Sequence, residues 1–313
     1  MGCVHAVPLS EQRVNWEIER EQSSARRELE NQIELFVVGS GNSGKTTLVK
    51  QLTCISSPHS QYASAEYRRE AFVTVIHANL YDGVFALLYA FPNQLAITNE
   101  EMEMLSEGYQ RHRLPPSCAK RMIAILNQYS ALALGNDPNL QDCFLVFAQK
   151  LVEGYPQWGG EEIEWTPTIE DCIRARVRTT GVTKQTIHFR DTTFHLVDVG
   201  GQKAERRKWL HTFDTVDKLL FVCAASEYDQ EMYEEANKNR LLDSLELFQE
   251  VANMECFAQK PFLLLLNKQD LFEEKISRVP LSASGIPGAP TELVPLAAAI
   301  RKTFARYLSH VGK

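Results

Sequence analysis

The sequence contains few cysteines, and their spacing matches neither a metal site nor a disulfide framework. No Cys-x-x-Cys pair occurs, and the number of cysteines is odd. Several of them lie in apolar segments, so we expect buried free thiols in a reducing compartment. Zinc and disulfide classes are therefore not supported. The seven cysteines are Cys3, Cys54, Cys118, Cys143, Cys172, Cys223 and Cys256.

The sequence also lacks an excess of basic residues and shows no signal peptide, and we expect no apolar run of the roughly 20 residues that a membrane span requires. Its formal net charge of −7 argues against nucleic acid as a main partner. With 313 residues, 44% hydrophobic and 23% charged, the chain has an ordinary globular composition. That length allows one large domain or two ordinary ones.

A glycine-rich stretch follows an apolar segment near the start of the chain. Residues 33–38 have the composition of a buried strand, residues 39–46 read G-x-x-x-x-G-K-[ST], and residues 47–52 suit a helix. This context predicts a P-loop, in which backbone N–H groups and a helix N-terminus bind phosphate. We expect Lys45 to reach the β- and γ-phosphates and the Thr46 hydroxyl to ligate Mg²⁺. The candidate ligands here are Gly39, Gly41, Asn42, Ser43, Gly44, Lys45, Thr46 and Thr47.

A Gly-rich turn that matches the motif by chance is the alternative to a P-loop, and the strand, lysine and hydroxyl argue against it. The motif alone does not separate ATP from GTP.

The remainder of the chain divides by its pattern into a helical part and an α/β part. We expect helices at 65–91, 98–109, 118–134 and 139–152, then a hairpin at 186–189 and 193–197. Continuous apolar runs at 219–224 and 262–266 predict strands buried on both faces. Helices are expected near 204–213 and over 230–253. The predicted fold is a doubly wound α/β domain (31–56 and 171–313) interrupted by an all-α domain (61–164).

The first 30 residues predict an exposed, charged segment with a possible lipid anchor. Residues 10–31 have too few large apolar side chains for a core face, which favours an exposed helix. Gly2 is permissive for myristoylation, but Ala6 stands where Ser or Thr is usual, and Cys3 is a candidate for palmitoylation. An unmodified, disordered terminus is the alternative.

Two short polar motifs follow expected strands. Asp198 precedes Gly200, Gly201 and Gln202, so its carboxylate can hold Mg²⁺, the Gly201 N–H can approach a γ-phosphate, and Gln202 can orient an attacking water. An ordinary strand-to-helix turn is the alternative.

Residues 267–270 read Asn-Lys-Gln-Asp. Their terminal carboxylate can accept both the N1–H and the exocyclic amine of guanine, so this motif favours GTP over ATP.

With these motifs, the chain resembles the α subunits of heterotrimeric G proteins, which are Ras-like P-loop GTPases with an inserted helical domain. Residues 171–181 are similar to that family's first switch, and residues 198–209 are similar to its second. Residues 226–230 and 267–275 match as well. The resemblance covers about residues 31 to 280. It is specific, because small GTPases lack both the insert and an intrinsic arginine.

The resemblance implies roles for particular residues. Arg176 would be the intrinsic arginine finger, Thr179 a second protein ligand to Mg²⁺, and Gln202 the residue that positions water. Arg174, Arg176 and Arg178 alternate, so spacing alone does not choose among them. Besides the P-loop residues, the implied contacts to GTP or GDP are Ile173, Arg174, Arg176, Thr179, Asp198, Gly200, Gly201, Gln202, Asn267, Lys268, Gln269 and Asp270, with Thr46, Thr179 and Asp198 on the metal.

The family further implies a signalling GTPase on the cytoplasmic face of the plasma membrane. Its expected partners are a βγ dimer, an effector and the membrane surface. Asn42 stands where the family has Glu, and Lys203 replaces an Arg of the second switch. Nothing after Asp270 resembles the family's last strand, its Thr-Cys-Ala-Thr loop or its final helix. From this we expect weaker binding and faster release of GDP than in a full-length family member, and no coupling to a receptor.

Two rival functions remain open at this point. One is a P-loop ATPase or nucleotide kinase, against which Asp270 and the helical insert argue. The other is a shortened, non-switching protein that sequesters partners, which the C-terminal sequence motivates.

Overall fold

The computed structural model describes residues 31–57, 60–131, 142–154, 165–206, 208–209, 216–232, 238–257 and 260–280. The predictions for the N-terminal helix, for Gly2 and Cys3, and for the segment after residue 280 lie outside these residues. In chain order, the strands are β1 (Gln32–Val38), β2 (Val182–Phe189), β3 (Thr192–Val199), β4 (Lys218–Ala224) and β5 (Phe262–Asn267). The helices are α2 (Lys45–Ser56), α3 (Ala65–Ala90), α4 (Asn99–Gln110), α5 (Pro116–Ala131), α6 (Asp142–Gly154), α7 (Ile169–Arg174), α8 (Lys203–Arg206), α9 (Arg240–Ala252) and α10 (Gln269–Ile276).

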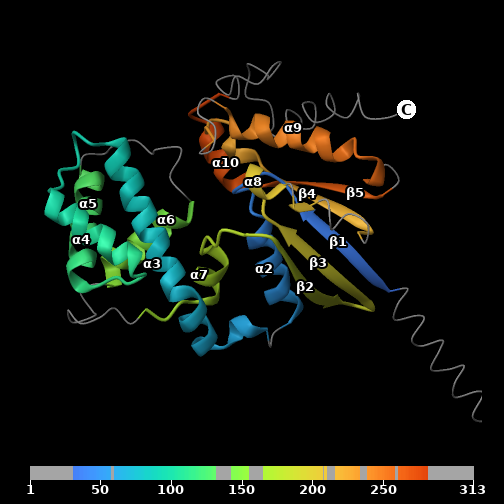
Figure 1. Ribbon diagram of the computed structural model, residues 1–313, viewed down its shortest axis with the longest axis horizontal. Helices are drawn as coiled ribbons and strands as arrows, with labels where there is room; N and C mark the ends of the chain where they lie inside the picture. The colour runs from blue at the N-terminus through green and yellow to red at the C-terminus, as the bar shows by residue number, and fades with distance from the viewer. Residues whose placement is uncertain are drawn as a thin grey trace, which may run out of the picture.

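The five strands form one sheet in the order β2-β3-β1-β4-β5. Strand β1 pairs in parallel with β3 and with β4, strand β5 pairs in parallel with β4, and β2 is antiparallel to β3. Helix α2 lies on one face of the sheet, and α9 lies on the other (Figure 1). The predicted doubly wound α/β fold is therefore confirmed, and its P-loop lies at the carboxyl end of β1, where such sheets bind ligands.

Alternating side chains of β1 supply both faces of the sheet with core residues. Phe36 and Val38 are fully buried against the α9 side, while Val37 faces α2. Because successive side chains of a strand point to opposite faces, β1 packs against a layer of helix on each face of the sheet. The free energy of burying both faces holds the P-loop strand at the centre of the sheet, with β3 on one side and β4 on the other.

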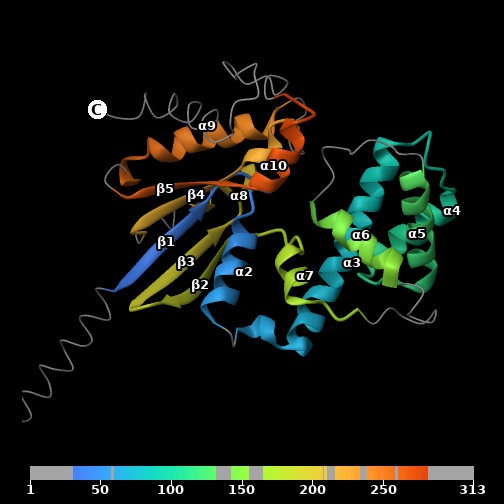
Figure 2. The same cartoon turned by 180° about the vertical axis from the view of Figure 1, so that it is seen from behind.

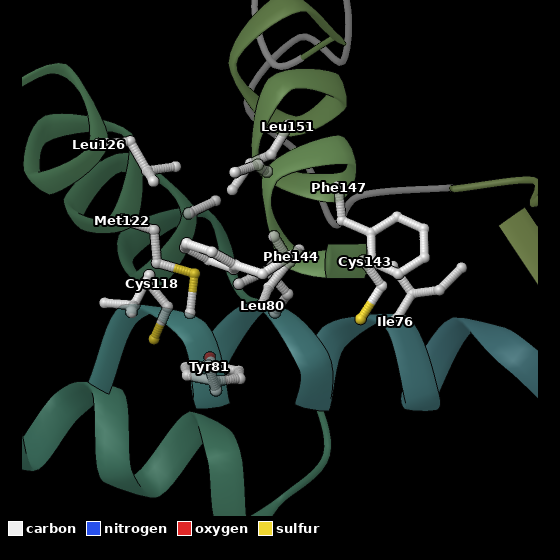
Figure 3. Packing of buried hydrophobic residues seen from close by; sticks show 14 of the residues in the cluster. Ile76, Leu80, Tyr81, Cys118, Met122, Leu126, Cys143, Phe144, Phe147 and Leu151 are labelled. Atoms are coloured by element: carbon white, nitrogen blue, oxygen red, sulfur yellow. The ribbon is translucent and has the colours of Figure 1, made fainter. Parts of the chain in front are cut away.

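Helices α3 to α6 pack around their own hydrophobic core, beside the sheet (Figure 2). Their bounds lie within three residues of the expected ones. Figure 3 shows side chains of α5 and α6 meeting those of α3, with Phe144 lying over Leu80. Most of the labelled residues are fully buried. The helical part therefore has a core of its own, although the exact domain bounds given above stay predictions.

Gly83 of α3 lies against the ring of Phe144, and this contact fixes how closely α3 and α6 approach. A Cβ at residue 83 would lie 2.0 Å from Phe144 Cδ2, and the Phe144 side chain is fully buried. We expect Gly83→Ala to lower the free energy of unfolding by about 1–2 kcal/mol, because overpacking outweighs the gain in helix propensity.

Thermal unfolding measures this effect, with Ser130→Ala on the exposed surface of α5 as the control. An unchanged or raised melting temperature for Gly83→Ala would contradict the packing argument.

Three expectations about helices need correction. The expected helix 230–253 begins only at Arg240, because Asn239 caps α9: its Oδ1 accepts from the backbone N–H groups of Leu241 and Leu242. The helix expected at 204–213 is α8, which ends at Arg206; residues 208–209 form a 3₁₀ turn, and 210–213 lie outside the described residues.

Of the described helices, α3 is long and apolar enough to span a membrane, contrary to the expectation that no such run exists. Because α3 is the core helix of the helical part, this is weak support for a span.

Candidate functional site

A cavity of about 710 Å³ lies between the sheet and the helical part. It is lined by the P-loop, by α7 and the segment after it, by the start of the second switch and by the loop after β5. Fifteen of the predicted site residues line it: Gly41, Asn42, Gly44, Lys45, Thr46, Thr47, Ile173, Arg174, Arg176, Thr179, Gly201, Gln202, Asn267, Lys268 and Asp270. Segments far apart in the sequence therefore converge on one cavity, as the motifs predict.

Lys45 is buried and folds back over the P-loop. Its Nζ donates to the carbonyl oxygens of Gly39 (3.0 Å) and Ser40 (2.7 Å) and to Ser43 Oγ (3.3 Å). Burial lowers its pKa to about 8, while the Asp198 carboxylate opposes that shift. A positive charge is thus held at the base of the loop in a site of low dielectric, where it attracts an anion strongly.

The three predicted metal ligands meet at Thr46. Its Oγ1 lies 2.7 Å from Thr179 Oγ1 and donates to Asp198 Oδ2 at 2.6 Å. Asp198 is almost fully buried, and burial raises its pKa. Its second oxygen, Oδ1, has no hydrogen-bond partner among the described residues. Two hydroxyls and a carboxylate with a spare oxygen form a set of hard ligands.

The second switch is fixed by side chains that bind its carbonyl groups. Trp209 Nε1 donates to the carbonyl of Gly200 at 3.0 Å, and Arg206 Nε donates to that of Gly201 at 3.1 Å. Arg206 also pairs with buried Asp243 of α9, at 2.5 Å. Gly201 has no space for a side chain, since an added Cβ would lie 2.3 Å from Lys45 Nζ. The backbone of this segment therefore lies directly against the P-loop.

Gln202 follows this backbone and lies beside the P-loop. Its Cγ is 3.5 Å from where a Cβ on Gly41 would lie. The buried Oε1 of Gln202 has no hydrogen-bond partner among the described residues. An unpaired buried amide oxygen at a cavity wall has spare capacity to accept from a ligand or a water.

The structure distinguishes the three alternating arginines that spacing could not. Arg174 pairs with Glu170 one turn earlier on α7, at 2.9 Å, and its side chain is 47% exposed. Arg178 is exposed. Arg176 is half-buried, and burial lowers its pKa; among the described residues it has no carboxylate partner. Of the three, Arg176 is the one whose guanidinium is withdrawn from solvent.

The loop after β5 is tied to the P-loop. Asn267 Nδ2 donates to the carbonyl of Ser43 at 2.9 Å, and Lys268 Nζ donates to Glu227 at 3.2 Å. Asp270 lines the cavity. In contrast, the side chain of Gln269 donates to Glu273 on the exposed side of α10. The expected base-binding loop is therefore adjacent to the phosphate-binding loop, with the Gln269 side chain directed elsewhere.

A model of the family described as G-protein alpha subunit matches residues 12–311, nearly the whole chain. The chain belongs to this family. Family members are GTP-binding, GTP-hydrolysing proteins that act as signal-transducing switches, and the resemblance found in the motifs is thereby confirmed.

Curated relatives agree with this assignment. The chain is 33% identical over 263 residues to a guanine nucleotide-binding protein G(o) subunit alpha from Locusta migratoria, covering 80% of this chain and 71% of the relative. A protein of the same name from Geodia cydonium is 33% identical over 296 residues, covering 88% and 78%. A guanine nucleotide-binding protein subunit alpha from Sporothrix schenckii is 31% identical, covering 90% and 80%.

In this G-protein alpha-subunit chain, the motifs missed several cavity residues. Glu227, Gln230 and Arg240 line the cavity from the region between β4 and α9, and Arg240 Nη1 donates to Gln230 Oε1 at 3.1 Å. Lys50 of α2 is buried and binds the carbonyls of Cys172 and Ala175, both at 2.9 Å. Glu227 lies in the 226–230 stretch that carried the resemblance. Lys50 had no motif to mark it beyond its position one turn into the P-loop helix.

Proposed function

We propose that this cavity binds GTP or GDP together with Mg²⁺ and hydrolyses GTP slowly, so that the two nucleotides define two states of the switch segments. The observation that carries the proposal is the meeting of Thr46, Thr179 and Asp198, because it joins the P-loop, the first switch and the end of β3 at one point. Thr46, Thr179 and Asp198 would hold a γ-phosphate and its metal at that point, and loss of these contacts on hydrolysis would release the switch segments.

The residues at this point fit Mg²⁺. Among the described residues, no group of three or more histidine, cysteine, aspartate or glutamate side chains can hold a metal. Two hydroxyls and one carboxylate, with the remaining positions left to water and phosphate oxygens, are the ligands that Mg²⁺ prefers. The unpaired Oδ1 of Asp198 supports this, because a buried carboxylate oxygen needs a partner. Bound Mg²⁺ would neutralise charge on the phosphates.

The protein's own residues supply the rest of the chemistry. Lys45 neutralises phosphate charge from the base of the P-loop. Arg176 stabilises charge that develops on the transferred phosphoryl group, and Gln202 orients the attacking water through its free amide oxygen. Phosphoryl transfer needs little covalent help from the protein, so positioning and charge neutralisation suffice.

The partners proposed for this chain are a G-protein βγ dimer and an effector, with attachment to the cytoplasmic face of the plasma membrane through a lipidated N-terminus. Family membership supports heterotrimeric partners in general. The specific partners, Cys3 palmitoylation and the doubtful coupling to a receptor remain proposals, since the N-terminal segment and the segment after residue 280 lie outside the described residues.

The nucleotide content of the purified protein tests the central proposal. We expect bound GDP, which exchanges with added nucleotide faster when EDTA removes the metal and more slowly when Mg²⁺ is in excess. Bound ADP or ATP would assign the chain to the ATPase class instead. A protein that neither holds nor binds guanine nucleotide would favour the non-switching alternative.

Asp270→Asn is expected to weaken selectivity for guanine more than it weakens phosphate binding. The guanine N1–H and amine would lose a charged acceptor, which costs about 1–3 kcal/mol, or about 5- to 150-fold in relative affinity. Competition between GTP and ATP for the protein measures this change.

Glu273→Ala, on the exposed side of the same helix, is the matched control. If the Asp270→Asn variant keeps the parent's preference for GTP over ATP, the base is recognised by other residues.

A further inference from the structure

Asn79 is a buried amide in the middle of α3, the long core helix of the helical part. It is 4% exposed, and Ile76, about one turn earlier on the same face, and Leu80, the next residue, are fully buried. A buried amide in such a core requires hydrogen-bond partners. Its partners lie outside α3, in the segment that follows α7.

Both bonds to that segment go to Arg176. Asn79 Nδ2 donates to the Arg176 carbonyl at 3.0 Å, and Asn79 Oδ1 accepts from the Arg176 backbone N–H at 2.8 Å. One side chain therefore binds both backbone polar groups of one residue, 97 positions away in the sequence. The Cys143 thiol of α6 lies 3.8 Å from Asn79 Oδ1 as a weak additional donor.

The segment that carries Arg176 has little other support. Residues 176–180 between α7 and β2 have no regular secondary structure. Lys50 fixes the carbonyls of Cys172 and Ala175, which lie just before Arg176. After it, the next described anchor is Thr179, through its contact with Thr46. Bonds to both backbone polar groups of one residue restrict its rotation, so Asn79 determines where the Arg176 side chain departs from the backbone.

We propose that Asn79 is a positioning residue for hydrolysis: the helical part holds the Arg176 backbone through this amide, and so directs the guanidinium into the cavity. This inference rests on the proposed role of Arg176. It gives the helical part a function in the reaction itself, beyond covering the cavity. Misplacement of a reacting group by about 1 Å can cost about 100-fold in rate.

Single-turnover hydrolysis of prebound GTP, started with Mg²⁺, tests the proposal independently of nucleotide exchange. We expect Asn79→Ala to slow this step by about 10- to 100-fold while GDP affinity changes little. In an Arg176→Ala background, the same substitution should change the rate by less than about twofold, because the two residues act as one unit. A residue with a merely structural role would not show this loss of effect.

Tyr81→Phe is the matched control in the same helix. It removes the hydrogen bonds of the Tyr81 hydroxyl, among them the one to the carbonyl of Arg113 at 2.9 Å, all within the helical part. It should lower the melting temperature and leave the hydrolysis rate at the parent value. If Asn79→Ala does not fold, Asn79→Asp keeps the size and the acceptor for the Arg176 N–H, and its rate should lie below the parent's.

Two outcomes would overturn the inference. One is a parent-like rate for a folded Asn79 variant. The other is an equal slowing by Asn79→Ala with and without Arg176. If Arg176→Ala itself hydrolyses GTP at the parent rate, the proposed function of Arg176 fails first, and that result is distinguishable because it does not involve Asn79 at all.

Discussion

Arg176→Ala and Gln202→Leu should each leave GTP binding largely intact and slow its hydrolysis strongly. Both side chains are placed to act on charge and water in the transition state, which makes their loss a loss of rate more than of affinity. For an arginine in this reaction, the rate should fall by about 10³–10⁵, the factor known for this protein family. For Gln202 we expect about 10²–10⁴.

Single-turnover hydrolysis measures both variants, and nucleotide affinity is measured in parallel to separate binding from chemistry. Arg178→Ala is the control for Arg176, because Arg178 alternates with it in sequence but is exposed. If Arg178→Ala proves to be the slow variant, the assignment among the three arginines is wrong. If either Arg176→Ala or Gln202→Leu keeps the parent rate, that residue has no part in the reaction.

Lys45→Ala should have the largest effect on nucleotide binding itself. The substitution removes a buried positive charge from the base of the P-loop and leaves the carbonyls of Gly39 and Ser40 without their donor. Charge-assisted hydrogen bonds of this kind contribute about 1.5–3 kcal/mol each, so we expect at least about a 10- to 100-fold loss of GTP affinity. Equilibrium binding of GTP and GDP gives the result.

Lys45→Arg is the informative second variant. It keeps the charge, but Gly201 packs so closely against Lys45 Nζ that a planar guanidinium has no room. We therefore expect Lys45→Arg to lose almost as much GTP affinity as Lys45→Ala. Lys184→Ala removes an exposed lysine paired with Glu34 and serves as the control. Full affinity in Lys45→Ala would mean that the P-loop backbone alone binds the phosphates.

The site residues that could be predicted from the sequence lie in short, contiguous motifs. The P-loop, Asp198 to Gln202 and Asn267 to Asp270 each follow a strand, and parallel strands deliver their carboxyl ends to one edge of the sheet. Because each motif follows a strand of the same sheet, the strand pattern is sufficient to predict that the motifs converge. The cavity lining shows that convergence.

Residues that act through long-range contacts could not be found in this way. In the sequence, nothing distinguishes Asn79 from other polar residues of an apolar helix, because its partner Arg176 lies 97 positions away. Likewise, spacing alone did not choose among the alternating arginines: the family resemblance named Arg176, and the pairing of Arg174 with Glu170 and the burial of Arg176 distinguish the two side chains in the structure. The prediction placed the start of α9 too early, because the charged residues before Asn239 have ordinary helix propensity. The start of the helix depends on the capping hydrogen bonds of Asn239, which propensity does not show.

The contact between Gly83 and Phe144 limits the order in which this chain can change during evolution. Any side chain at residue 83 collides with a fully buried ring, whereas a smaller residue at 144 merely leaves a void. Loss of the buried phenylalanine ring costs about 3–5 kcal/mol, more than the about 1–2 kcal/mol expected for alanine at position 83, so the less costly order places alanine at position 83 first. The two positions should covary among orthologues, and alanine at position 83 should occur less often with phenylalanine at position 144 than with a smaller residue there.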